Sequence, residues 1–304
     1  MRSAPLQYGI MRSFLRPILV LVQLLCFGQA AKHLVNVKQI THGGQNAEAY
    51  WAPDGKRLIF QATRDTSECD QQYIMNADGS DMHMVSTGKG VTTCGYFLAD
   101  GKHIVYASTH EAGPSCPARP DRSKGYVWAV YPGFDIYLAD DKGKIEKKLT
   151  DSAGYDAEAT INWKNNKIIY TSMASGDLDL WSMNLDGSGK KQLTKTEGYD
   201  GGAVFSRDGS NAKQITNYGC ASFAPTFTPD GKKILFSSNK QKCDSRDFEL
   251  YTINLDGSGL EQVTSYGGFT SFPEFSPDGK KIVFVSSYQG KGDYEFNVFT
   301  ADWK

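Results

Sequence analysis

The chain has 304 residues, of which 40% are hydrophobic, 12% aromatic and 22% charged, and its formal net charge is −1. This length permits one large domain or two ordinary ones, and the 31 glycines favour a turn-rich all-β protein over a helical one. Because the charge is near zero and no basic run is interleaved with aromatic residues, we expect no nucleic-acid partner.

Residues 1–31 have the order of a secretory signal peptide. Met11, Arg12 and Arg16 precede an apolar stretch over 18–27, and Gly28 and Ala30 supply small residues at the −3 and −1 positions of a cleavage site. The stretch is too short for a good membrane span. We therefore expect an exported chain, periplasmic or extracellular, with no stable membrane span after cleavage. A lipid anchor on Cys26 and an uncleaved anchor stay open as alternatives.

One phrase of roughly 45 residues then recurs along the chain. It contains a turn and an apolar strand, as in Thr-Pro-Asp-Gly-Lys-Lys-Ile-Leu-Phe at 228–236, then Asn-Leu-Asp-Gly-Ser at 254–258, and it closes on Gln-Val-Thr at 262–264. Ser-Pro-Asp-Gly-Lys-Lys-Ile-Val-Phe at 276–284 starts the phrase again. Proline presets φ in such turns and glycine takes the position with φ above zero, so each turn marks a hairpin. The pattern predicts four short strands per unit, and hence a β-propeller as the single domain over 32–304.

Six units can be marked in the sequence. They cover about 47–88, 90–150, 157–194, 200–216, 221–264 and 270–304. The sixth unit stops after its third strand, whereas residues 34–41 end in Gln-Ile-Thr, like an outermost strand without a unit. We expect 34–41 to complete the last blade and close the ring, because closure removes unpaired sheet edges.

The second and fourth units depart from the phrase. The second carries an insertion, 110–132, which we expect either to cover the channel or form a partner surface, or to pack on its own blade. In the fourth, the innermost-strand turn and the outermost-strand turn share the single pair Asp208-Gly209, so two strands are missing. The sequence predicts a truncated fourth blade, with the ring strained, gapped or repacked there.

Five cysteines remain after removal of the signal peptide. Export permits disulfides. Spacing favours a Cys220–Cys243 pair, while Cys94 could pair with Cys116 or with Cys69. An odd count leaves one thiol over, and a fully reduced set stays open.

The Pro-Asp-Gly-Lys and Asn-x-Asp-Gly-Ser turns resemble those of the TolB-like, WD-repeat-like propeller family over about 33–304. The resemblance implies six blades of four strands, and an exported protein that recognises other proteins or peptides at the mouth of the channel. Similar propellers serve as gating domains in prolyl oligopeptidase-like enzymes, and some are fused to amidohydrolases. The short fourth unit departs from the family pattern.

Residues at the start of each innermost strand are expected to line one mouth of the channel. Glu48 and Glu158 fall at equivalent positions, as do Asp156 and Asp200. Like charges held close need cations or water, so this mouth could take a divalent cation or a basic peptide, unless the carboxylates only cap strand ends. The candidate binding residues are Glu48, Asp156, Glu158, Asp200, the aromatic walls Tyr155 and Tyr199, and His42.

No catalytic residue can be assigned. The chain has no Gly-x-Ser-x-Gly elbow, and its five histidines have no metal-like spacing. Our first hypothesis is a monomeric, exported, non-enzymatic propeller that binds a protein or peptide without a cofactor. One alternative is a metal-dependent propeller enzyme, a lyase or hydrolase, which only the acidic cluster favours. The other is an accessory propeller of a prolyl oligopeptidase-like or amidohydrolase partner.

Overall fold

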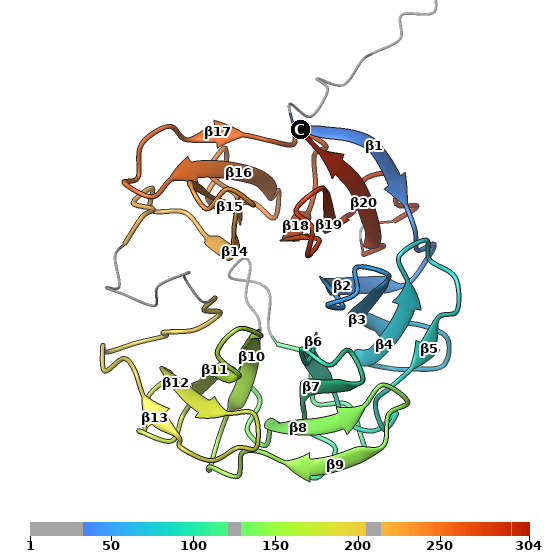
Figure 1. Cartoon of the computed structure of the whole chain (residues 1–304), viewed down its shortest axis with the longest axis vertical. Helices are drawn as coiled ribbons and strands as arrows, with labels where there is room; N and C mark the ends of the chain where they lie inside the picture. Colours follow the sequence, from blue (N-terminus) through green and yellow to red (C-terminus); the bar gives the residue numbers. More distant parts are fainter. Residues whose placement is uncertain (1–32, 121–128, 205–213, 293) are drawn as a thin grey trace, which may run out of the picture.

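The computed structural model describes residues 33–120, 129–204, 214–292 and 294–304, so the predicted signal peptide lies outside the described residues. These residues form five four-stranded antiparallel sheets and no helix. Figure 1 shows the sheets set around a ring, with one strand of each nearest the centre. Within the described part of the chain, nothing has the length and apolar character of a membrane-crossing helix.

In four blades the strands follow one another in the chain from the centre outward, and in the fifth the N-terminal strand is the outermost. The first blade is β2 (Gln45–Trp51), β3 (Arg57–Thr63), β4 (Gln71–Asn76) and β5 (His83–Met84); the second is β6 (Thr92–Phe97), β7 (His103–Ser108), β8 (Asp135–Asp140) and β9 (Ile145–Lys148); the third is β10 (Asp156–Asn162), β11 (Lys167–Ser172), β12 (Asp179–Asn184) and β13 (Lys191–Gln192); the fourth is β14 (Ser222–Phe227), β15 (Lys233–Ser238), β16 (Glu249–Asn254) and β17 (Glu261–Gln262); the fifth is β18 (Thr270–Phe275), β19 (Lys281–Ser286), β20 (Asn297–Trp303) and β1 (Leu34–Gln39).

The prediction of ring closure by the N-terminal segment is confirmed. β1 pairs antiparallel with β20, with Lys38 opposite Thr300, and the two strands lie side by side in Figure 1. The Thr41 hydroxyl accepts a hydrogen bond from the Val298 N–H at 2.8 Å. The same bond is made by Thr150, Thr194 and Thr264, and by Ser86 in the first blade. A hydroxyl at the end of each outermost strand therefore satisfies an N–H of the third strand and ties the two together.

The prediction of six blades is wrong, since the described residues form five. The truncated fourth unit contributes no strand at 200–204 or 214–219, and 205–213 lie outside the described residues. Its ends still keep the places of an inner and an outer strand. Thr160 Oγ1 on the third blade donates to Ala203 O at 2.9 Å, and Ile215 packs against a cluster of the next blade that includes Tyr251. Without the two middle strands, no sheet can join them.

The repeated turns owe their shape to an aspartate. In the hairpin between β18 and β19, Asp278 Oδ1 accepts hydrogen bonds from Ser276 Oγ at 2.6 Å and from the Lys280 N–H at 3.1 Å. Gly279 adopts φ 71°, a conformation that costs glycine little. The Pro-Asp-Gly phrase therefore closes hairpins, as the sequence predicts.

The core lies between neighbouring blades. Val105 and Ile136 of the second blade and Ile168 of the third are fully buried and pack in one cluster. Sheets in a propeller bury their flat faces on each other, so the large apolar residues of the middle strands hold the ring together. The innermost strands are then left to face the channel.

Candidate functional site

The innermost strands of all five blades surround a cavity of about 1260 Å³. This volume exceeds the roughly 300–1,000 Å³ of most small-molecule pockets. The described parts of the 110–132 insertion reach it, because Arg119, Pro120 and Tyr131 are among the lining residues. The cavity enclosed by the innermost strands is therefore the candidate binding site.

Each innermost strand carries a β-bulge that aims one side chain into this cavity. The pairing of the innermost with the second strand shifts register at the same point in all five blades. At that point one non-glycine residue has positive φ, namely Glu48 (50°), Cys94 (51°), Glu158 (58°), Ala224 (51°) and Phe272 (54°). Such a backbone costs a non-glycine residue roughly 1 kcal/mol or more, and bulges commonly re-aim side chains beside binding sites.

The five bulge residues divide the channel into two halves. The acidic half consists of Glu48, Cys94 and Glu158, on three consecutive blades. The apolar half consists of Ala224 and Phe272, on the other two. All five line the cavity. A ligand in the channel would therefore meet carboxylates on one side and a hydrocarbon wall on the other.

The carboxylate of Glu158 is fully hydrogen-bonded within its own chain. Its carboxylate accepts hydrogen bonds from Thr171 Oγ1 at 2.7 Å and from the Tyr155 hydroxyl at 3.1 Å, both on the third blade. The Tyr199 hydroxyl and the Gly202 N–H, in the segment that leads into the truncated unit, each approach it at 2.7 Å. Charge-assisted bonds of this length are strong, so Glu158 anchors that segment to the channel wall.

Glu48 has only distant partners at the equivalent position. The Tyr50 hydroxyl lies 3.4 Å from one carboxylate oxygen, and the Thr93 hydroxyl lies 3.5 Å from the other. The walls of the cavity withdraw Glu48 from water, and with the nearby charges of Glu158 and Asp70 this raises its pKa to about 7. The Cys94 thiol, a weak donor, also bonds to this carboxylate. Glu48 thus faces the cavity with a thiol and two long hydroxyl contacts, and with no cation.

A cluster of phenylalanines forms the apolar half. The ring of Phe272 lies 5.6 Å from that of Phe223 and 6.1 Å from that of Phe269, and Phe269 lies 5.2 Å from Phe296, all between centroids. Ring pairs at these separations gain stability from edge and offset contacts. All four residues line the cavity, which gives the channel a rigid aromatic wall.

A third carboxylate, Glu274 of β18, joins the fifth blade to the first. Its Oε2 accepts a hydrogen bond from the Trp51 N–H at 2.6 Å, and burial raises its pKa to about 8. Tyr50 of the first blade stacks on Tyr96 of the second, with ring centroids 4.1 Å apart. The sequence argument missed Glu274, because the Pro-Asp-Gly turns align the starts of strands and say nothing of the residues after a bulge.

The structure brings together four of the seven candidate residues from the sequence. Glu48, Glu158, Tyr155 and Tyr199 line the cavity, whereas Asp156, Asp200 and His42 do not.

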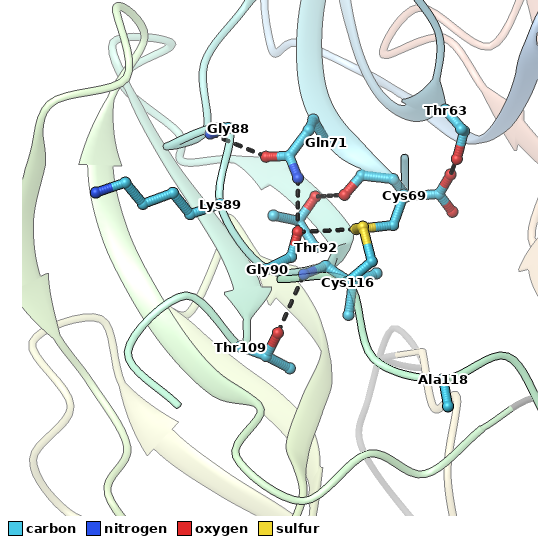
Figure 2. Close-up of a disulfide and its surroundings, with 12 residues drawn as sticks. Thr63, Cys69, Gln71, Gly88, Lys89, Gly90, Thr92, Thr109, Cys116 and Ala118 are labelled. Carbon is cyan, nitrogen blue, oxygen red and sulfur yellow. Dashed lines mark hydrogen bonds between the residues drawn. A yellow bond between two sulfur atoms is a disulfide. The ribbon is translucent and has the colours of Figure 1, made fainter. Parts of the chain in front are cut away.

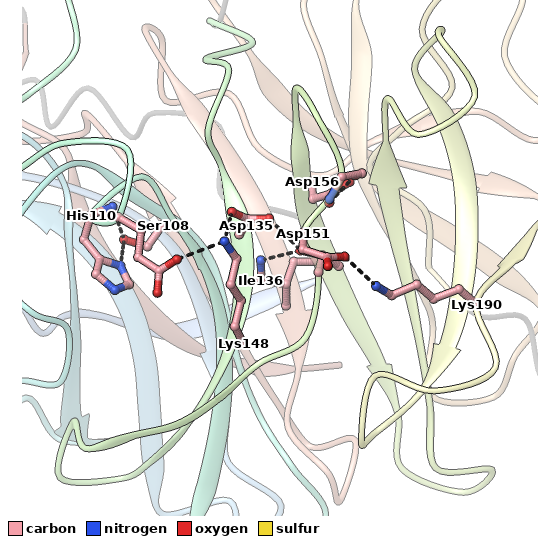
Figure 3. Close-up of polar contacts among 11 residues, drawn as sticks. Ser108, His110, Asp135, Ile136, Lys148, Asp151, Asp156 and Lys190 are labelled. Carbon is pink, nitrogen blue, oxygen red and sulfur yellow. Dashed lines mark hydrogen bonds and ion pairs between the residues drawn. The ribbon is translucent and has the colours of Figure 1, made fainter.

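Asp156, which is labelled in Figure 3, is buried and accepts a hydrogen bond from Ser152 Oγ at 2.5 Å, which is a strand-capping role. The same figure shows the neighbouring Lys148 bonded to Asp135 at 2.7 Å. Asp200 accepts from Thr196 Oγ1 at 2.5 Å, and His42 is exposed beside Gln39.

The described structure contains two disulfides. Cys220 pairs with Cys243, as the spacing favours, and Cys69 pairs with Cys116. Cys94 is buried and unpaired, so its proposed pairing with Cys116 or Cys69 is wrong, because the bulge turns its thiol into the channel. Figure 2 shows the Cys69–Cys116 bond, which fastens the insertion of the second blade to a loop of the first.

The described residues contain no cluster of side chains that is suited to bind a metal ion. Among those residues, no three side chains of histidine, cysteine, aspartate or glutamate gather closely enough to hold a metal ion. Burial also raises the pKa of the Cys94 thiol well above its usual value, which disfavours the thiolate that binds metals. What the arrangement offers is hydrogen-bond acceptors and an aromatic wall.

Comparison with known proteins places the chain among propellers. Residues 210–300 match the family model of the TolB β-propeller domain. No curated protein matches the chain. Among solved structures, TolB from Acinetobacter baumannii is 16% identical, with 85% of this chain and 54% of that chain covered and a TM-score of 0.43. An oligogalacturonate lyase from Vibrio parahaemolyticus is 14% identical, with 88% and 93% covered and a TM-score of 0.48.

The two structural likenesses are too distant to carry an argument about activity, and the chain spans only about half the length of the first. The family match is more specific, since it covers the last two blades, where the Pro-Asp-Gly and Asn-x-Asp-Gly turns are most regular. This match confirms the predicted resemblance to TolB-like propellers over residues 210–300, and the described part of the chain is a β-propeller of five blades.

Proposed function

We propose that this chain is an exported, non-enzymatic TolB-like propeller that binds a segment of a protein or peptide in its channel. The observation that carries the proposal is the cavity of about 1260 Å³ with carboxylates on one wall and phenylalanines on the other. Peptides display polar and apolar side chains along one backbone, so they match a site of mixed character better than a small uniform ligand does.

The rigidity of the site also supports binding. Every bulge residue sits on a strand of a four-stranded sheet, and the phenylalanines of the apolar half pack on one another. A preformed wall loses little conformational freedom when a ligand arrives, so more of the contact energy remains as affinity. The two disulfides fit an oxidising compartment and thus an exported protein.

Panning a random octapeptide library, displayed on phage, on the immobilised mature chain (32–304) would test the proposal. Ala224→Trp should fill the channel from a bulge position and reduce capture at least about tenfold. Ala174→Trp, at an exposed position outside the cavity lining, is the matched control. Thr226→Trp offers a second filling variant, and melting curves would confirm that each variant folds. Equal capture by the control and both filling variants would refute channel binding.

Export can be tested separately from binding. Residues 1–31 fused to alkaline phosphatase should give activity, because that enzyme needs disulfides formed outside the cytoplasm. A fusion in which the apolar stretch 18–27 carries two aspartates should be inactive, since a charged stretch no longer acts as the apolar region of a signal. Activity of both fusions, or of neither, would count against the predicted signal.

A further inference from the structure

Glu48 and Glu158 occupy the same bulge position, and the chain shows what one of them binds. At Glu158, the segment Tyr199–Gly202 lies on the carboxylate and donates a hydroxyl and a backbone N–H to it. Gly201 fits there without a side chain, since a Cβ would lie 2.5 Å from Glu158 Oε2. A carboxylate at the bulge position of an innermost strand can therefore bind a peptide segment.

Glu48 presents the same group to the cavity without such a segment. Its nearest hydroxyls lie 3.4 and 3.5 Å away, beyond the usual length of a good O–H···O bond. A carboxylate withdrawn from water and left without strong donors is costly unless a partner arrives. The backbone of Glu48 is also in an unfavourable conformation, with φ 50°.

The charges around Glu48 favour a cation over a neutral donor. Glu158 and Asp70 add negative potential at Glu48. The lining residues with positive charge are Arg119, Arg246 and Lys291, and all three are solvent exposed. Among the described residues, none forms an ion pair with Glu48 that would neutralise it.

The surroundings of this carboxylate suit an ammonium or guanidinium group. Tyr50 and Tyr96 stack beside Glu48 and line the same cavity. Aromatic faces attract cations, and this attraction grows where water is excluded. On the adjacent fifth blade, Phe272 and its neighbours offer the hydrocarbon surface that a side chain next to the cation would contact.

We infer that the bound segment places a positively charged group against Glu48 and an apolar side chain against Phe272. This inference rests on the proposed function. The charged group is a lysine or arginine side chain or a free amino terminus, which share the same chemistry. Glu158 stays occupied by the chain's own segment and takes no part in contacting the ligand. Glu48 is then the residue that sets the preference for basic peptides.

The sequences of library peptides before and after panning give the direct test. Wild-type protein should enrich lysine or arginine next to an aromatic or large aliphatic residue. Glu48→Gln, which keeps the shape of the side chain, should lose the basic preference and keep the apolar one. Phe272→Ala should do the reverse. Glu197→Gln, an exposed carboxylate outside the cavity lining, is the matched control and should retain both preferences.

Synthetic peptides then separate the sources of the charge. For the most enriched sequence, replacing its lysine by norleucine should weaken binding about tenfold if the side chain carries the charge, as expected when one ion pair of about 1.4 kcal/mol is lost. Acetylating the amino terminus should do so if the terminus carries it. Insensitivity to both changes would overturn the inference.

The outcomes distinguish the inference from the function on which it rests. Enrichment of peptides without basic residues, or a basic preference that survives Glu48→Gln, would overturn the inference and leave channel binding intact. No enrichment by the wild type over Ala224→Trp would instead refute the proposed function, and the inference with it.

Discussion

Glu48 and Glu158 have the same backbone conformation on equivalent strands, yet they differ in every partner. Four donors satisfy Glu158, and two of them come from the segment that leads into the truncated unit. Glu48 has only two long hydroxyl contacts, from Tyr50 at 3.4 Å and Thr93 at 3.5 Å, and a bond from the weakly donating thiol of Cys94. The repeat therefore places a carboxylate at the bulge position of both strands. The segment that leads into the truncated unit covers the carboxylate of Glu158 and leaves that of Glu48 open to the cavity.

The largest effect expected from this difference is on stability. Glu158→Ala should lower the melting temperature by about 6 °C, because losing its bonds and leaving the buried Thr171 hydroxyl unpaired costs about 3 kcal/mol. Glu48→Ala should change it by less than about 2 °C, since few bonds are lost. Differential scanning fluorimetry of the mature chain at pH 7 measures both.

Glu158→Gln is the control for this comparison, because an amide retains one acceptor oxygen. Its melting temperature should lie between those of the wild type and Glu158→Ala. Equal losses for Glu48→Ala and Glu158→Ala would show that the two carboxylates are equally embedded, contrary to their hydrogen bonds.

The next effect concerns the pH dependence of peptide binding. Glu48 has a pKa near 7, so it is ionised at pH 8 and mostly protonated at pH 6. Protonation removes the charge that attracts a cation, so the Kd of a lysine-containing peptide should rise about tenfold from pH 8 to pH 6. The groups facing Glu48 are Glu158, Asp70, Cys94 and Tyr50. Fluorescence anisotropy across this range gives the curve.

In Glu48→Gln the same titration should be nearly flat. The peptide should contain no histidine, so that no group of the ligand titrates between pH 6 and 8. If both proteins showed the same tenfold change, a group other than Glu48 would control binding.

The fold was predictable to the extent that local turn chemistry repeats. Pro-Asp-Gly turns close hairpins through an aspartate such as Asp278, and the Gln-Ile-Thr at 39–41 identified the strand that closes the ring. The count of blades failed at the fourth unit, because its two remaining segments were expected to form a truncated blade. In the described residues they form no strand, since the two middle strands that would join them into a sheet are missing.

The site was less predictable, for a geometric reason. Alignment on the turns placed Glu48 and Glu158 together correctly, but it also included Asp156 and Asp200, which sit two residues before the bulge positions or outside the innermost strands. Side chains alternate in a strand, and a bulge shifts that alternation by one residue. Which carboxylate faces the channel therefore depends on φ at one residue, as at Cys94, which sequence spacing treated only as a disulfide candidate.

A smaller effect is expected at Glu274, the carboxylate that bonds Trp51 across two blades. Burial raises its folded pKa from 4.5 to about 8, so the protonated form stabilises the fold at low pH, and this stability is lost as the pH rises from about 4.5 to about 8. Glu274→Gln stays neutral and keeps an acceptor for the Trp51 N–H. It should melt about 2 °C above the wild type at pH 9, a gain of roughly 1 kcal/mol, and at the same temperature at pH 5. A gain at pH 5 as large as at pH 9 would exclude charge burial as the cause.

The smallest effect is expected at Cys94, the third member of the acidic half. Its thiol is buried and faces Glu48, and burial raises its pKa well above the usual value, so almost no thiolate exists at pH 8. A thiol reagent such as Ellman's should find almost no reactive thiol in the folded mature chain and about one per chain in denaturant, with the disulfides intact. Cys94→Ser, which retains a hydrogen-bond donor, should give no signal in either condition and should shift melting by less than about 2 °C. Rapid reaction of the folded wild type would mean that solvent and reagent reach the bulge freely, and the acidic half would then be too open to withdraw Glu48 from water.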